Sequence, residues 1–206
     1  MCIYTILSLL IIFVLISSVS AADVNTDATN LTSLSGNDEI VGIQNEFDVL
    51  GIDTSTFSVL KDEIGNGGNK TLQHDYYTSN GAVSTIDIQI DNSVIDGNGA
   101  VIDMAGSNIR VFNVFASGVT IKNLTIINAS HDGDGAAFYF TKAGGTIENC
   151  NFIDNSASGM GGVVYFNQRG TLSNCNFTGN TADFGGAVYL NSDGSDYFVT
   201  NCNFNN

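Results

Sequence analysis

The stretch Thr146-Ile-Glu-Asn-Cys-Asn-Phe152 decides the fold, because close copies of it return further along the chain. The copies are Thr171-Leu-Ser-Asn-Cys-Asn-Phe177 and Phe198-Val-Thr-Asn-Cys-Asn-Phe204, and a degenerate copy, Ile121-Lys-Asn-Leu-Thr-Ile126, precedes them. Equivalent residues lie 25 to 27 positions apart. A period of this length indicates a repeat protein, in which each unit packs only on its neighbours.

A second block repeats in phase with the first. Gly161-Gly-Val-Val-Tyr-Phe166 matches Gly185-Gly-Ala-Val-Tyr-Leu190, and more loosely Gly135-Ala-Ala-Phe-Tyr-Phe140. Each unit holds short strand-like runs separated by Asn, Gly, Asp or Ser, and none holds a helix-long stretch of 3.6-residue periodicity. The pattern predicts an all-β fold, a parallel β-helix of about 25 residues per turn. We expect it to be right-handed, the hand that parallel crossovers strongly prefer.

Coiling such units stacks equivalent strands about 4.8 Å apart, so side chains that point inward form columns. The sequence predicts one column of Ile121, Ile147, Leu172 and Val199, and another of Ile126, Phe152, Phe177 and Phe204. A third contains Phe138, Val164 and Val188, beside Phe140, Phe166 and Leu190.

Two further columns carry polar or reactive side chains. We predict a structural asparagine ladder at a bend of the coil, made of Asn123, Asn149, Asn174 and Asn201. The cysteines Cys150, Cys175 and Cys202 share the phase of Leu124, so we interpret them as small buried apolar residues. One disulfide or a metal site remains an alternative for these cysteines.

The amino-terminal part predicts export and a capped start. Residues 1–22 have the apolar run and small-residue end of a cleaved signal peptide, with a retained anchor as the alternative. Residues 23–54 read as a flexible acidic leader. Within residues 55–80 we expect an N-terminal cap with a short amphipathic helix, started by Ser55 or Thr56 and ended at Gly65.

Residues 81–206 form the predicted β-helix, and the sequence stops midway through a repeat. We therefore expect the helix to be truncated at its C-terminal end, as part of a longer protein or completed by another chain.

The chain carries 21 Asp and Glu against 6 Lys and Arg, a formal net charge of −15. Such a charge repels phosphate backbones, so nucleic acid is excluded as an expected partner.

Candidate binding residues lie between the inward columns. Tyr139, Tyr165 and Tyr189 are expected to point outward as a ladder that either stacks across strands or binds a sugar. Asp132 and Asp134 lie in a loop that we interpret as structural. As an alternative, their carboxylate oxygens could bind Ca²⁺. Lys122 and Glu148 are expected to form an exposed ion pair. We predict no catalytic residues and no required cofactor.

The chain resembles pectin lyase-like right-handed β-helix proteins, and most closely the adhesin-like surface proteins of methanogenic archaea. The resemblance rests on FxxN and GGA[IV] repeats of the polymorphic outer-membrane protein type. FxxN appears as Phe152-Ile-Asp-Asn155 and Phe177-Thr-Gly-Asn180, and the second element as Gly161-Gly-Val-Val164 and Gly185-Gly-Ala-Val188.

The resemblance implies an extracellular or cell-surface protein with an adhesion or structural role and no enzymatic activity. Its partners would be surface glycans or other host or microbial cell-surface components. Membrane contact would come only from the signal peptide or from an anchor outside this chain. The alternatives are a purely structural spacer and a carbohydrate-active lyase or hydrolase, because β-helices carry both inert and catalytic functions. An enzyme would need a carboxylate cluster on one face, which the repeats do not assemble.

Overall fold

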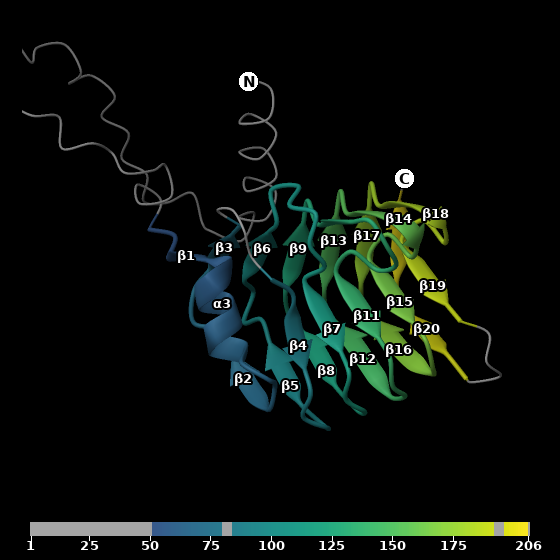
Figure 1. Cartoon of the computed structure of the whole chain (residues 1–206), viewed down its shortest axis with the longest axis horizontal. Coiled ribbons are helices and arrows are strands. Elements are labelled where there is room, and N and C mark those ends of the chain that lie inside the picture. Colours follow the sequence, from purple (N-terminus) through teal and green to yellow (C-terminus); the bar gives the residue numbers. More distant parts are fainter. Residues whose placement is uncertain (1–50, 80–83, 192–195, 206) are drawn as a thin grey trace, which may run out of the picture. The chain divides into compact units, whose positions relative to one another are not determined.

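The structure, a computed structural model, describes residues 51–79, 84–191 and 196–205. Within these ranges the chain is a coil of short parallel strands with one helix at its start (Figure 1). The predicted signal peptide and all but the last few residues of the predicted leader lie outside the described residues.

The strands form four parallel sheets, which we name sheets A to D, and one turn of the coil contributes one strand to a sheet. Sheet A contains β1 (Thr54–Thr56), β3 (Tyr76–Thr78), β6 (Val101–Asp103), β9 (Thr125–Ile127), β13 (Asn151–Ile153), β17 (Asn176–Thr178) and β21 (Asn203–Asn205). Sheet B contains β2 (Asn69–Thr71), β5 (Val94–Asp96), β8 (Thr120–Lys122), β12 (Gly145–Glu148), β16 (Gly170–Ser173) and β20 (Phe198–Thr200).

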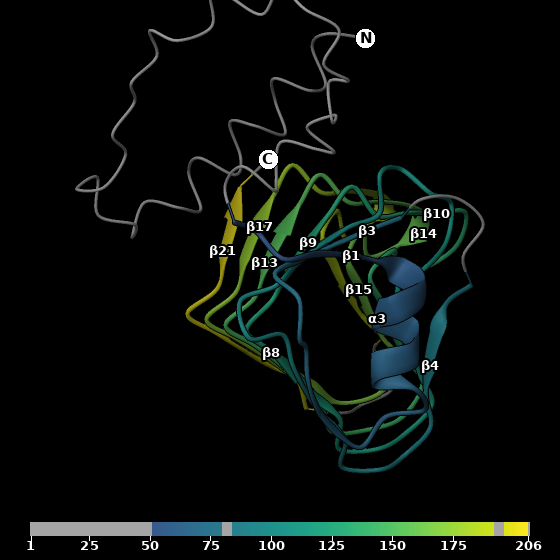
Figure 2. The ribbon, with the colours of Figure 1, turned by 90° about the vertical axis from the view of Figure 1, so that its left-hand side faces the viewer.

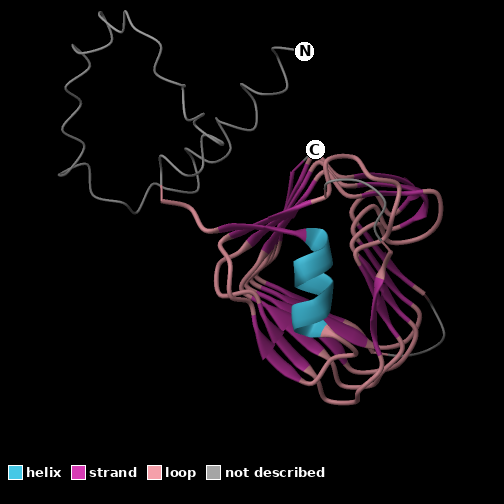
Figure 3. Ribbon diagram, turned by 60° about the vertical axis from the view of Figure 1, so that its left-hand side comes forward, coloured by secondary structure: helices cyan, strands magenta, loops and turns pink. Residues whose placement is uncertain are grey.

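The other two sheets are smaller. Sheet C contains β4 (Ile86–Ile88), β7 (Phe112–Val114), β11 (Phe138–Phe140), β15 (Val164–Phe166) and β19 (Val188–Leu190). Sheet D contains β10 (Ser130–His131), β14 (Ser156–Met160) and β18 (Thr181–Phe184). A complete turn therefore runs from sheet A through sheets D and C to sheet B and back to A (Figure 3).

The strand register confirms the predicted columns. Ile147 pairs with Ile121 on one side and with Leu172 on the other, which are 26 and 25 residues away. Phe152 pairs with Ile126 and Phe177 in the same way, and its ring stacks on that of Phe177 with centroids 5.0 Å apart. These inward side chains are almost fully buried, so the interior of the coil is one continuous apolar core.

The helix α3 (Phe57–Ile64) lies at the end of the coil that carries the first strands (Figure 2). Thr56 is its N-cap, with a side chain that accepts a hydrogen bond from the backbone N–H of Val59, and Gly65 is its C-cap. Phe57, Leu60 and Ile64 are fully buried in the core. The predicted helix and both of its predicted ends are confirmed.

The ordered cap begins before the expected boundary at residue 55. Strand β1 includes Thr54, and the carbonyl of Asp53 accepts hydrogen bonds from the backbone N–H groups of Asp75 and Tyr76 at the start of β3. The imidazole of His74 lies between two carboxylates, with Nδ1 2.9 Å from Asp53 Oδ2 and Nε2 3.4 Å from Glu63 Oε1. These contacts tie the entering chain to α3.

The hydroxyl of Tyr77 is buried in the same cap and donates to Glu63 Oε2 at 2.7 Å. Burial and the hydrogen bond to Glu63 raise the pKa of Tyr77 to about 12. The protonated phenol is therefore the form that the folded cap favours. Its contribution to the free energy of unfolding is present below about pH 10 and is lost as the pH rises through about 12.

A Tyr77→Phe variant should remove this alkaline component while keeping the ring in place. We expect the wild type to lose more stability than the variant between about pH 10 and 12, because in this range the unfolded phenol is ionised and only the wild type must take up a proton on folding. Urea unfolding at several pH values measures the difference. Parallel pH profiles for the two proteins would contradict the prediction.

Phe152→Ala tests the inward column directly. The side chain is fully buried and contacts the rings of Phe177 and Phe138, so truncation leaves a cavity between turns. We expect a loss of about 3–5 kcal/mol in the free energy of unfolding, measured by urea denaturation. The matched control is Phe115→Ala, since Phe115 is 45% exposed and should lose far less. Similar losses in both variants would contradict the assigned core.

Candidate functional site

The predicted asparagine ladder forms the bend between sheets B and A. Asn123, Asn149, Asn174 and Asn201 all have a left-handed backbone, with φ between 52° and 56°. Asparagine tolerates this conformation better than most residues with a side chain. The amide of Asn174 donates to Asn149 Oδ1 and that of Asn201 to Asn174 Oδ1, both at 3.2 Å. One residue per turn therefore makes the bend, and the amides of Asn174 and Asn201 also bond it to the preceding turn.

A second asparagine ladder is buried, and the sequence analysis did not predict its role. Asn155 and Asn180, the last residues of the two FxxN motifs, are 0% and 2% exposed. The amide of Asn155 donates to the carbonyl of Ile126 at 3.1 Å and to Asn180 Oδ1 at 2.9 Å, and its oxygen accepts from the N–H of Ala129. These bonds join neighbouring turns where the chain leaves sheet A. The motif itself was the available signal, because a polar residue at a fixed distance from an inward Phe needs buried partners.

The paired glycines of the second motif are required by close backbone contacts. Gly161 has φ of 70°, and a Cβ on it would lie 2.2 Å from the carbonyl oxygen of Val164. A Cβ on Gly162 would lie 2.1 Å from the carbonyl oxygen of Gly186 in the next turn. Any larger residue would push the turns apart at this point. The GGA[IV] pattern is therefore explained by packing.

The cysteine column lies beside the asparagine bend, as expected. Cys150, Cys175 and Cys202 are free thiols, and the first two are fully buried. Each thiol donates to the backbone carbonyl two residues before it. The adjacent Cys175 thiol and burial raise the pKa of Cys150. These contacts are those of small buried side chains, and they keep Cys150 in its protonated form.

The predicted tyrosine ladder is in register on the outer face of sheet C. The rings of Tyr139 and Tyr165 are nearly parallel with centroids 4.8 Å apart, and those of Tyr165 and Tyr189 are 5.5 Å apart. Tyr165 is only 8% exposed because a ring covers each of its faces. The geometry is therefore that of cross-strand stacking, with the ring edges and hydroxyls left toward the outside. A ligand-binding role for these residues stays a prediction.

Arg110 covers the free face of the first tyrosine. Its guanidinium carbon lies 4.8 Å from the ring centroid of Tyr139, within the range of a cation–π contact. The group is fixed by donation to the carbonyl oxygens of Asp134 and Gly135 and to Asn113 Oδ1. Sequence reasoning did not find this contact, because Arg110 lies outside the tyrosine register.

The two aspartates proposed for calcium are held separately. Asp132 Oδ2 accepts from the amide of Asn108 at 2.6 Å, and Asp134 Oδ1 accepts from the backbone N–H of Met160 at 2.8 Å. In the described ranges, no group of three or more His, Cys, Asp or Glu residues is placed to hold a metal ion. The structure thus adds no further ligand to the proposed pair, and the calcium site stays a prediction.

Lys122 has a different partner from the expected one. Its Nζ lies 3.4 Å from Asp96 Oδ2 on the preceding turn, although Glu148 is also in register with it on the following turn. Asp96 accepts from the amide of Asn123 as well, and this hydrogen bond is the largest cause that lowers its pKa. The carboxylate is therefore already fixed in place beside the lysine, which favours this pairing.

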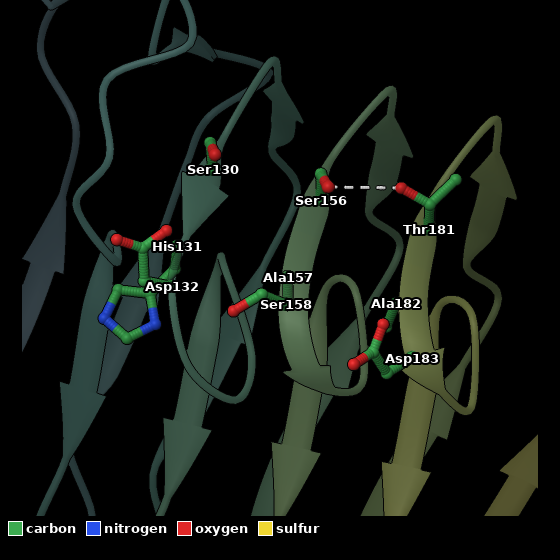
Figure 4. A pocket seen from close by; sticks show the side chains of 9 residues that line it. All are labelled: Ser130, His131, Asp132, Ser156, Ala157, Ser158, Thr181, Ala182 and Asp183. Atoms are coloured by element: carbon green, nitrogen blue, oxygen red, sulfur yellow. Dashed lines mark hydrogen bonds between the residues drawn. The ribbon is translucent and has the colours of Figure 1, made fainter.

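A shallow groove of about 410 Å³ lies over sheet D. Most of its lining side chains carry oxygen, and the aligned residues of neighbouring strands repeat the same chemistry (Figure 4). Ser130, Ser156 and Thr181 form one row across the strands, and Thr181 donates to Ser156 at 3.2 Å. The remaining lining residues are His131, Asp132, Ala157, Ser158, Ala182 and Asp183.

The histidine of the groove is held as a neutral imidazole. Its Nδ1 accepts from the backbone N–H of Gly133 at 2.9 Å and lies 3.4 Å from a guanidinium nitrogen of Arg110. Burial and the positive charge of Arg110 lower the pKa of His131. Nε2 therefore carries the ring proton and is the nitrogen available as a donor.

The family model of the right-handed β-helix region matches residues 58–204. The chain belongs to the right-handed β-helix family. The match also shows the right-handed coil that the crossover rule predicted. No curated protein matches the chain, and no solved structure matches it. Among the residues that the structure describes, no helix has the length and apolar character needed to cross a membrane.

Asn155→Ala tests the buried ladder of this β-helix. The change leaves the N–H of Ala129 and the carbonyl of Ile126 without their side-chain partner, at a cost of about 1–3 kcal/mol for each buried group. The control is Asn176→Ala on the exposed face of sheet A, for which we expect about 0.5 kcal/mol or less. Thermal and urea unfolding compare the two. Equal effects would show that the FxxN asparagine has no special role.

Proposed function

We propose that this β-helix is a secreted or cell-surface protein with an adhesion or structural role and without enzymatic activity. The observation that carries the proposal is that the repeated polar side chains contact one another on the outside of the coil. The asparagine amides form hydrogen bonds with those of adjacent turns, and the tyrosine rings stack on one another. These contacts hold the turns together and make the outer surface rigid. Rigid extended surfaces of this kind suit the display or binding of cell-surface components.

The adhesin-like resemblance and the predicted signal peptide support the same proposal. Both favour a mature protein that acts outside the cell, where its partners would be surface glycans or other host or microbial surface components. The formal net charge of −15 favours partners that are neutral or positively charged. Any anchor would lie outside this chain or in its first residues.

The test is binding of the purified, fluorescently labelled chain to intact cells and to isolated cell envelopes. We expect saturable binding that survives washing, together with no release of reducing ends or unsaturated products from a panel of polysaccharides. A Tyr139/Tyr165/Tyr189→Phe triple variant, which keeps the stacked rings and removes their hydroxyls, reports on the outer edge of sheet C.

The outcomes separate the alternatives. Saturable binding without cleavage supports adhesion, and loss of binding in the folded triple variant would assign it to the tyrosine hydroxyls. Cleavage of any polysaccharide would overturn the non-enzymatic proposal. A folded protein without surface binding would overturn adhesion and leave the structural role.

A further inference from the structure

The outer face of sheet D carries many side chains that end in oxygen atoms. The row of Ser130, Ser156 and Thr181 lies on three adjacent strands, and Asp132, Ser158 and Asp183 follow two residues later in each strand segment. Neighbouring strands are about 4.8 Å apart, and residues two apart in a strand are separated by roughly 6.6 Å. The first row therefore offers hydroxyl oxygens at regular intervals across the strands. Asp132 lies beyond the end of β10 and the register of β14 and β18 shifts after Ala157, so the second set of oxygens is less evenly spaced.

The floor of the groove is formed by the strand backbone, because its two alanine side chains turn toward the core. Ala157 is buried at 4% exposure, and Ala182 is its partner in the next strand. The oxygen-bearing side chains stand above this backbone floor, and Figure 4 shows Ser158 and Asp183 below the Ser130–Thr181 row. The volume of about 410 Å³ lies within the range of roughly 300–1,000 Å³ found for small-molecule sites.

The polar groups of the groove match a ligand rich in hydroxyls. Serine and threonine both donate and accept, the aspartates accept, and Nε2 of His131 donates. A sugar presents donors and acceptors on every ring carbon that bears a hydroxyl, so it can pair with this mixture. A basic peptide would use only the two carboxylates and leave the hydroxyl rows unmatched.

The charge of the groove selects among sugars. Asp132 and Asp183 are exposed carboxylates at its two sides, and no lining side chain is a lysine or an arginine. A uronic acid would meet repulsion from both carboxylates and from the net charge of the chain. An amino group on the ligand would instead be attracted to them.

We propose that the groove over sheet D binds an oligosaccharide of neutral or amino sugars laid across strands β10, β14 and β18. The assignment rests on the proposed adhesive function and names its site and ligand class. It favours the groove over the tyrosine ladder, because the ring faces of the tyrosines already cover one another.

The experiment is isothermal titration of the purified chain with three oligosaccharides of equal length. The probes are an N-acetylglucosamine oligomer, which is neutral, a glucosamine oligomer, which is cationic, and a galacturonic acid oligomer, which is anionic. We expect the first two to bind and the third to bind at least about tenfold more weakly. An oligolysine peptide tests the competing ligand class.

Two variants locate the site. Ser158→Gln places a longer neutral side chain in the groove and should lower the affinity for both bound sugars at least about tenfold. Asp183→Asn removes one carboxylate and should weaken the glucosamine oligomer by about threefold or more, and by more than it weakens the neutral oligomer. The control is Thr178→Gln, an exposed hydroxyl residue on the outer face of sheet A, and the tyrosine triple variant is a second control. Circular dichroism confirms that each variant is folded.

Each outcome decides the proposal. Binding of neutral and amino sugars that is lost in Ser158→Gln and kept in both controls supports it. Loss in the tyrosine variant instead, preference for the uronic acid, or binding of oligolysine alone overturns it. Cell-surface binding without affinity for any oligosaccharide overturns the assignment of the groove as a sugar site and still supports the adhesive function. Absence of both kinds of binding overturns both.

Discussion

Equivalent side chains of successive turns pack directly on one another, and the other features of the structure depend on this contact. Parallel strands about 4.8 Å apart bring each inward residue against its counterparts 24 to 27 positions away. Aliphatic and aromatic side chains then fill a continuous interior, as the stacked rings of Phe152 and Phe177 show. The turns differ in length by a few residues and their strands still stay in register, so the connections between strands absorb the difference and the strand positions are what is constrained.

Asparagine solves two problems that this stacking creates. The coil must bend sharply between sheets, and backbone groups at each bend lose their ladder partners. At the bend between sheets B and A, asparagine adopts the left-handed conformation and its amide bonds to the preceding turn. Where the chain leaves sheet A, Asn155 and Asn180 bond to backbone groups inside the core. These two positions give a structural cause for six of the 25 asparagines in the chain.

Sequence analysis predicted the features that follow from a fixed phase or a capping pattern, but it missed the role of the buried Asn155 and Asn180 although their FxxN motif repeats. The inward columns, the asparagine bend and α3 were predictable because each follows from a fixed phase or a capping pattern. The contact of Arg110 with Tyr139 was not, because it joins residues that are out of register. Lys122 had two in-register acidic neighbours, and only the position of Asp96 decided between them. The groove over sheet D was also missed, since its residues are small and carry no motif, and it appears only when three turns are aligned.

The most direct test of the account removes one whole turn from the middle of the chain. Deleting residues 151–175 joins Cys150 to Asn176, which restores the Cys-Asn step and leaves the remaining columns in phase. Deleting residues 151–162 removes about half a turn and breaks the phase of every later column. Circular dichroism with thermal unfolding of both variants is the measurement. The account predicts a folded, cooperatively unfolding whole-turn variant and a half-turn variant that loses its β-structure beyond the junction. Equal folding or equal unfolding of the two would contradict the claim that in-register stacking of turns determines this structure.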